Sequence, residues 1–125
     1  MRLLLDTHAL LWWLTGDESL SPEALGAISS PASTVYVSPA SIWEASIKRS
    51  LGRLEAPSDL AGWVTKAGFS ELPIVMQHAE HAGALPLHHA DPFDRMLIAQ
   101  AVLEGLTIVT RDPAFAAYDV PLLPA

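Results

Sequence analysis

The acidic residues of this 125-residue chain fall where a sheet-based fold would bring them together. Asp6 ends one short apolar run and Asp112 follows another by three residues, and both runs are typical of buried strands. Glu44 lies about a turn and a half into a predicted helix. Asp94 lies in the first turn of another helix, with Asp91 just before it. Because ligands of open α/β sheets bind beyond the carboxyl ends of the strands, we expect these carboxylates to share one pocket.

Such a cluster calls for a cation, because like charges held close together do not all stay ionised unaided. A site made only of oxygen ligands favours a hard ion, Mg²⁺ or Mn²⁺, over zinc. A metal held there would lower the pKa of its bound water and stabilise charge on a leaving oxygen.

Each acid also has a purely structural alternative. Asp6 and Asp112 have the sequence context of helix N-caps, and the second is followed by proline at the first helical position. Asp91 and Asp94 would complement a helix N-terminus. Glu44 would pair with Lys48 four residues on, a contact that is worth about 0.2–0.5 kcal/mol. Only their joint placement on one sheet edge favours the metal pocket.

Four segments give the chain a recognisable pattern. It resembles the PIN domain family, and most of all the bacterial VapC-type toxins, through Leu4-Leu5-Asp6-Thr7-His8, Ser41-Ile42-Trp43-Glu44, Asp91-Pro92-Phe93-Asp94-Arg95-Met96-Leu97-Ile98-Ala99-Gln100-Ala101 and Ile108-Val109-Thr110-Arg111-Asp112. The resemblance covers the whole chain, in order and at ordinary spacing. It implies a Mg²⁺-dependent endoribonuclease that is the toxin of a type II toxin–antitoxin pair, with RNA as substrate and a cognate antitoxin as inhibitor.

Carried onto this sequence, the acidic quartet of the family falls on Asp6, Glu44, Asp94 and Asp112. We expect Asp6 and Asp94 to ligate the metal directly, and the other two to bind through water or to complete a second site. The neighbouring residues that would support the metal or the substrate are Thr7, His8, Asp91, Arg95 and Thr110. His8 departs from the family pattern, where a small polar residue is common, which indicates a different second layer around the metal.

The elements that must position these residues alternate along the chain. Short β-branched or apolar runs predict strands over 3–5, 34–37, within 69–75, over 107–109 and over 120–122. Capping residues, prolines and glycines predict helices over 7–14, 22–30, 39–50, 57–67, 77–83 and 92–104, with a loop over 84–90. This alternation predicts a three-layer, doubly wound α/β fold with a mainly parallel sheet of four to five strands.

Length and composition bound the function. We expect a single domain over 1–125. Half of the residues are hydrophobic, which is enough to form a core. The absence of cysteine excludes thiolate metal sites, and no apolar run is long enough for a membrane span, so we expect a cytoplasmic protein. The net charge of −7 argues against a protein that coats nucleic acid, but not against a nuclease whose metal supplies the positive field.

Several other residues remain open. His78 and His81 have the spacing of a zinc pair but lack further ligands, and the pair His88-His89 would line the rim of the site or fill a polar loop. Lys48, Arg49 and Arg53 either complement a helix C-terminus or contact phosphates. The four tryptophans are expected mostly in the core, with Trp12 or Trp13 available to a second copy of the chain or to the antitoxin.

Three other functions compete with the ribonuclease. A flap-type DNA nuclease uses a related acidic site but needs DNA-clamping elements for which the chain is too short. A phosphoacceptor receiver domain would need an acidic pair after the first strand and an acceptor aspartate after the third, and the sequence has neither. A catalytically inactive PIN module that only binds RNA or protein is disfavoured by the presence of all four acids.

Overall fold

The computed structural model describes residues 1–125, and its centre is one sheet of five parallel strands in the order β3-β2-β1-β4-β5. The strands are β1 (Arg2–Leu5), β2 (Thr34–Val37), β3 (Ser70–Glu71), β4 (Thr107–Thr110) and β5 (Leu122–Pro124). The chain builds one half of the sheet outward from β1 to β3, and then returns to build the other half from β4 to β5. The predicted doubly wound, parallel α/β fold is therefore confirmed.

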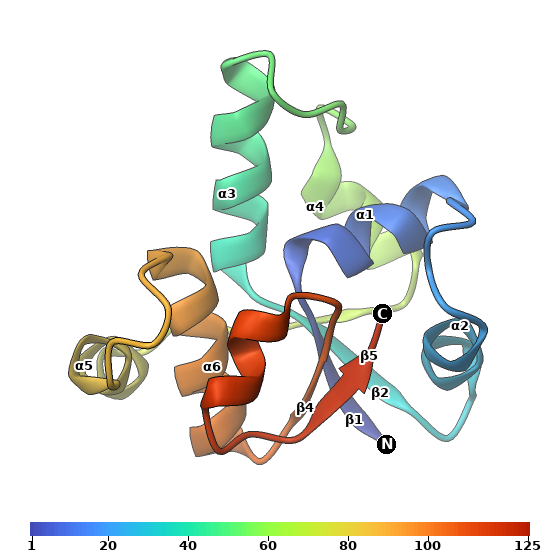
Figure 1. The fold of residues 1–125 in the computed structure, drawn as a ribbon. Helices are drawn as coiled ribbons and strands as arrows, with labels where there is room; N and C mark the ends of the chain where they lie inside the picture. The colour runs from blue at the N-terminus through green and yellow to red at the C-terminus, as the bar shows by residue number, and fades with distance from the viewer.

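Helices cover both faces of this sheet (Figure 1). They are α1 (Thr7–Thr15), α2 (Pro22–Ser29), α3 (Pro39–Ser50), α4 (Leu60–Lys66), α5 (Met76–Ala84) and α6 (Pro92–Glu104), and a short 3-10 helix, η1 (Pro113–Ala117), follows β4. None of these helices is both long and apolar enough to cross a membrane.

Side chains alternate between the two faces along the central strand. Leu3 and Leu5 pack into the larger core cluster with α1, α2 and α4, whereas Leu4 packs into the second cluster with α6 and η1. This alternation follows from the period of two of a β-strand. Because both faces are covered, β1 reads as a continuous apolar run, as is usual in parallel sheets.

The helix starts follow from local chemistry. Ser38 caps α3 by accepting a hydrogen bond from the Ala40 amide, and Asp91 caps α6 through the Phe93 and Asp94 amides. Each cap is followed by a proline at the first helical position, where the missing N–H costs nothing. These signals are why the predicted bounds of α3 and α6 agree with the structure.

The last strand lies two residues later than predicted. Pairing with β4 begins at Leu122, opposite Ile108, and the Pro121 carbonyl accepts the Ile108 amide at 2.9 Å. Val120, the predicted start of this strand, instead packs into the α6-side core cluster. Hydrophobicity alone therefore placed Val120 correctly in the core but in the wrong element.

Candidate active site

Asp6 and Asp112 lie at the point where the strand order reverses. Asp6 directly follows β1, and its amide donates to the Val109 carbonyl of β4 at 3.1 Å. Asp112 comes two residues after the end of β4 and caps η1. Because β1 and β4 are neighbours from which the chain proceeds in opposite directions, a crevice is expected beyond their carboxyl ends.

Two helices bring the remaining acids to the same place. Glu44 lies on the buried side of α3, and Asp94 lies in the first turn of α6. Together these elements form a pocket of 190 Å³ with no hydrophobic lining residue. The predicted residues in its wall are Asp6, Thr7, His8, Glu44, Asp91, Asp94 and Asp112. Lys48 and His89, for which the sequence left a role at the site as one of two alternatives, complete it.

Three of the aspartates are also helix caps, so the structural alternative is correct for them as well. Asp6 Oδ1 accepts from the Ala9 amide at 2.8 Å, and Asp112 Oδ1 accepts from the Ala114 amide at 2.9 Å. Asp91 Oδ1 accepts from the Phe93 amide at 2.8 Å. Each cap uses Oδ1, which leaves Oδ2 of the same carboxyl for a different partner. Capping and metal binding are therefore compatible in one side chain.

Both oxygens of Glu44 are already hydrogen-bonded. Oε1 accepts from the Thr7 hydroxyl at 2.5 Å, and Oε2 accepts from the Lys48 ammonium at 2.9 Å. The pair with Lys48 is thus present, and the hydrogen bond to Glu44 is the main reason why the pKa of Lys48 is raised. Glu44 is 5% exposed, so the ammonium compensates a buried charge at the pocket wall.

The pocket makes ionisation of Asp94 and Asp6 costly. Burial, and then the neighbouring charges of Asp91 and Glu44, raise the pKa of Asp94 to about 7, against the lowering effect of the hydrogen bond to His89. Burial also raises the pKa of Asp6, although hydrogen bonds from Thr110 and Ala9 oppose it. A divalent cation among these carboxylates would favour their ionised form, and this donor set fits a hard ion.

His89 enters the pocket from the loop between α5 and α6. Its Nε2 lies 2.7 Å from Asp94 Oδ2 and 3.6 Å from Asp112 Oδ2. These three residues form the one group of three or more potential ligands whose donor atoms all lie within 4.8 Å of one another. The expectation that His88 and His89 line the rim holds for His89, whereas the His88 ring packs against Tyr118.

Two arginines near the acids in sequence point away from them. Arg95 does not reach a carboxylate, because its guanidinium donates to backbone carbonyls, including those of Ala82, Leu85 and His89. Arg111 donates to the Ser19 and Ala125 carbonyls and stacks over Trp12. In this structure Arg95 thus holds the loop backbone instead of a carboxylate, and its role beside the metal or the substrate stays a prediction.

The polar residues beside the acids take different roles. Thr110 Oγ1 accepts from the Asp112 amide at 3.1 Å, so it positions the residue that follows β4. His8 is exposed and its ring lies 5.8 Å from that of Trp12. His78 is buried, with Nδ1 accepting from the Val75 amide and Nε2 bonded to Glu104. The cluster of potential ligands does not include it, so the zinc alternative receives no support.

The prediction that the tryptophans lie mostly in the core is wrong, because none is fully buried and only Trp12 and Trp13 pack against the larger core cluster. Trp43 is 65% and Trp63 42% exposed, and Trp12 and Trp13 are half-buried. On α3 the buried side carries small and polar residues together with Glu44, so Trp43 lies on the other side of the helix. Its ring meets that of Phe93 edge-on, with centroids 5.2 Å apart. The two rings precede Glu44 on α3 and Asp94 on α6 by one residue each.

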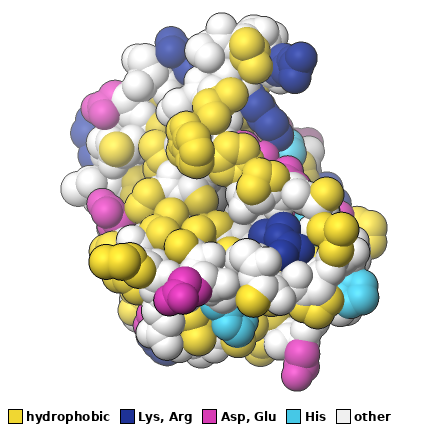
Figure 2. All heavy atoms as spheres, turned by 90° about the vertical axis from the view of Figure 1, so that its left-hand side faces the viewer, with side chains coloured by type: hydrophobic (Ala, Val, Ile, Leu, Met, Phe, Trp, Pro, Cys, Tyr) yellow, Lys and Arg dark blue, Asp and Glu magenta, His cyan; other side chains and the backbone are white.

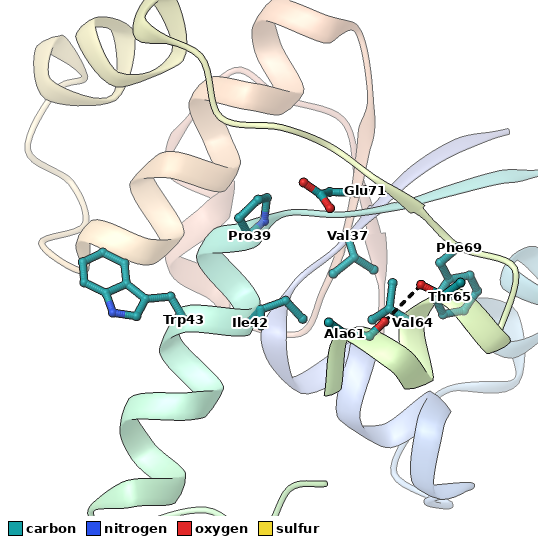
Figure 3. A pocket seen from close by; sticks show the side chains of 9 residues that line it. All are labelled: Val37, Pro39, Ile42, Trp43, Ala61, Val64, Thr65, Phe69 and Glu71. Carbon is teal, nitrogen blue, oxygen red and sulfur yellow. Dashed lines mark hydrogen bonds between the residues drawn. The ribbon is translucent and has the colours of Figure 1, made fainter. Parts of the chain in front are cut away.

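An apolar groove of 340 Å³ adjoins the acidic pocket across α3. Figure 3 shows Val37, Ile42 and Val64 around it, with Trp43 at one end and Phe69 at the other. Trp43 precedes Glu44 in α3, so one helix contributes to both the apolar groove and the acidic pocket. In Figure 2, hydrophobic side chains gather on the face that carries α3, α5 and α6.

The chain was compared with family models, curated proteins and solved structures. A family model described as "PIN domain" matches residues 3–121. No curated protein matches the chain. The acids that the sequence resemblance assigned therefore lie inside a matched family segment that spans nearly the whole chain.

Solved structures share the fold at low sequence identity. VapBC2 from Rickettsia felis, bound to a DNA fragment from its promoter, superposes with a TM-score of 0.72 at 12% identity over 98% of each chain. A toxin–antitoxin complex from Klebsiella pneumoniae superposes with a TM-score of 0.69 at 19% identity, and the match covers 98% of this chain and 96% of the other. DNA-bound VapBC from Salmonella typhimurium superposes with a TM-score of 0.66 at 16% identity, and the match covers 98% of this chain and 97% of the other.

Proposed function

The chain belongs to the PIN domain family, and from that premise we propose that it is a metal-dependent endoribonuclease and the toxin of a toxin–antitoxin pair. The observation that carries the proposal is the all-polar pocket beyond β1 and β4, where Asp6, Asp94 and Asp112 meet from three different elements. A pocket of this size with no apolar wall is suited to an ion and a phosphate rather than to an apolar ligand.

In this proposal Asp6, Asp94 and Asp112 hold Mg²⁺ or Mn²⁺, and Glu44 contributes through water because both of its oxygens already accept hydrogen bonds. When bound, the ion supplies an activated water and stabilises charge on the phosphodiester. Lys48 holds Glu44 in place and partly balances the acids. The reaction requires no serine, lysine or histidine nucleophile, since water attacks the phosphorus.

The metal and substrate classes are tested together by a cleavage assay. We expect the purified protein to cut RNA with added Mg²⁺ or Mn²⁺ and to lose this activity in excess EDTA, because carboxylates alone cannot stabilise an anionic transition state. Single-stranded DNA of the same sequence is the matched substrate. Full activity in EDTA, after removal of contaminating nucleases, would contradict the metal site, and cleavage of DNA alone would contradict the ribonuclease.

The toxin role is supported by the fold and by charge. Several of the similar solved structures are toxin–antitoxin complexes, and the fold likeness extends over nearly the whole of each chain. The metal-free pocket is rich in carboxylates, and such a cleft attracts a cation from a partner. We therefore propose that an antitoxin directs an arginine or lysine toward these acids and packs an apolar segment into the groove beside Trp43. Arginine suits this role better, since its fork can bridge two carboxylates.

A further inference from the structure

We propose that His89 is a direct ligand of the metal, together with Asp94 and Asp112, and that it makes the site prefer Mn²⁺ to Mg²⁺. The proposal extends the proposed function, because it uses the same metal site. It adds one ligand, His89, and a preference for one ion. Neither was expected from the sequence or from the family resemblance.

The first argument is the geometry of the three donors. His89 Nε2 lies 2.7 Å from Asp94 Oδ2 and 3.6 Å from Asp112 Oδ2, and one donor atom of each residue lies within 4.8 Å of the other two. Nitrogen and oxygen donors bind divalent first-row ions at about 2.0–2.2 Å, so two donors of one ion lie about 3 Å apart. Modest side-chain rotations therefore suffice to open the hydrogen bond and place an ion among the three atoms.

The second argument is that the loop carrying His89 is held firmly, although it has no secondary structure. The His88 and His89 amides donate to the Tyr118 hydroxyl at 3.2 and 2.9 Å, and this hydroxyl donates to the Pro86 carbonyl at 2.7 Å. Arg95 donates to the carbonyls of His89 and Pro86 from the other side. Both rigid anchors lie in the body of the fold, so the backbone of His89 is fixed before any ion arrives.

The ring of His89 is oriented as well as its backbone. It packs edge-on against Phe115, with centroids 6.0 Å apart, and its side chain is 18% exposed. Phe115 is fully buried, so it gives the imidazole a fixed wall. Supporting contacts of this kind place a metal ligand with the precision that binding requires.

The third argument concerns the type of ion. Mg²⁺ is a hard ion that binds oxygen and dehydrates reluctantly. An imidazole nitrogen suits transition ions, whose affinities for such ligands rise from Mn²⁺ onward along the first row. A site that adds one imidazole to the carboxylates of Asp6, Asp94 and Asp112 should therefore bind Mn²⁺ more tightly than an all-oxygen site would, with less benefit to Mg²⁺.

The test is electron spin-echo spectroscopy of the protein loaded with Mn²⁺, which detects nitrogen bound to the ion. We expect a ¹⁴N coupling in the wild type that disappears in His89→Gln. The matched control is His88→Gln, which removes the adjacent histidine whose ring packs on Tyr118 instead of entering the pocket. That control should keep the coupling, because the fixed backbone of the loop does not depend on the His88 ring.

Calorimetric titration of the same three proteins separates a ligand from a residue that acts through Asp94. His89→Gln should weaken Mn²⁺ binding by about tenfold or more, and Mg²⁺ binding by clearly less. Equal loss for both ions, or Mn²⁺ bound without a nitrogen coupling in the wild type, would overturn the proposal while leaving the nuclease assignment intact. Absence of any Mn²⁺ or Mg²⁺ binding would overturn the metal site and the proposed function with it.

Discussion

Two aspartates of the pocket use one carboxyl oxygen to cap a helix and leave the other oxygen for the proposed metal. Asp6 and Asp112 cap α1 and η1 through Oδ1, so each is fixed by the helix that it starts. An asparagine can still form such a cap, whereas alanine loses it at a cost of about 1 kcal/mol. Replacement of aspartate by asparagine is therefore the variant that removes charge and preserves local structure.

Asp94 should make the stability of the metal-free protein depend on pH. Burial raises its pKa to about 7 in the folded chain, against about 3.9 in an unfolded chain. Below about pH 4 the carboxyl is protonated in both states. Between about pH 4 and 7 the unfolded state loses this proton while the folded state keeps it, so the contribution to stability falls as the pH rises and is fully lost above about 7.

Asp94→Asn should therefore stabilise the metal-free protein at pH 8 and have little effect near pH 4. Water in the open pocket and added salt reduce the gain, so we expect about 1–2 kcal/mol at pH 8. Urea unfolding of wild type and variant in EDTA at both pH values measures it. A gain that is the same at both pH values would show that the effect does not come from ionisation.

The positions of the acidic side chains in the pocket could be predicted from the sequence, whereas those of the arginines and histidines could not. Asp6 and Asp112 could be placed because each follows a strand, and parallel strands end at one edge. Arg95 and Arg111 are each adjacent to an acid in sequence, but loop and chain-end carbonyls accept the hydrogen bonds of their guanidinium groups. His89 reaches the pocket only through loop contacts with Tyr118, which lies 29 residues away and has no sequence signal.

Among the elements, the loop between α5 and α6 depends most on single side chains. Arg95 donates to four backbone carbonyls there and at the end of α5, those of Ala82, Leu85, Pro86 and His89. A lysine keeps the charge but has no planar fork to bridge several carbonyls. The α3 and α6 bounds could be read from caps and prolines, whereas the course of this loop could not.

Arg95→Lys should loosen this loop without unfolding the sheet. We expect amide exchange at His88 and His89 to accelerate by tenfold or more, while exchange at Ile108 in the centre of β4 changes little, because local openings need not involve the core. Hydrogen exchange followed by NMR measures both. Parallel acceleration at all these amides would mean that Arg95 supports the whole fold instead of the loop.

At the scale of the molecule, the net charge of −7 and the acidic pocket set the type of partner. A basic side chain from an antitoxin and a divalent cation would compete for the same carboxylates. The apolar groove lies beside the pocket, so one segment of a partner can pack in the groove and place a basic side chain in the acidic pocket. Trp43, on α3 between the two, is positioned to take part in this contact.

Mg²⁺ and the antitoxin should therefore weaken each other's binding. We expect the affinity of the complex to fall as Mg²⁺ is titrated at constant ionic strength, since coupling between two ligands is reciprocal. An antitoxin found to be encoded beside this gene would be the binding partner to use, and K⁺ at matched ionic strength is the control. An affinity that does not respond to Mg²⁺ would mean that the inhibitor acts outside the acidic pocket.

The most direct measurement of the central claim is RNA cleavage by wild type, Asp94→Asn and Asp119→Asn under identical Mg²⁺ concentrations. Asp119 is an exposed acid outside the pocket, so its variant makes the same change of charge elsewhere. If the pocket is the catalytic centre, Asp94→Asn loses cleavage by at least about a hundredfold while Asp119→Asn and wild type cut alike. A folded Asp94→Asn protein that cuts RNA at the wild-type rate would contradict the account.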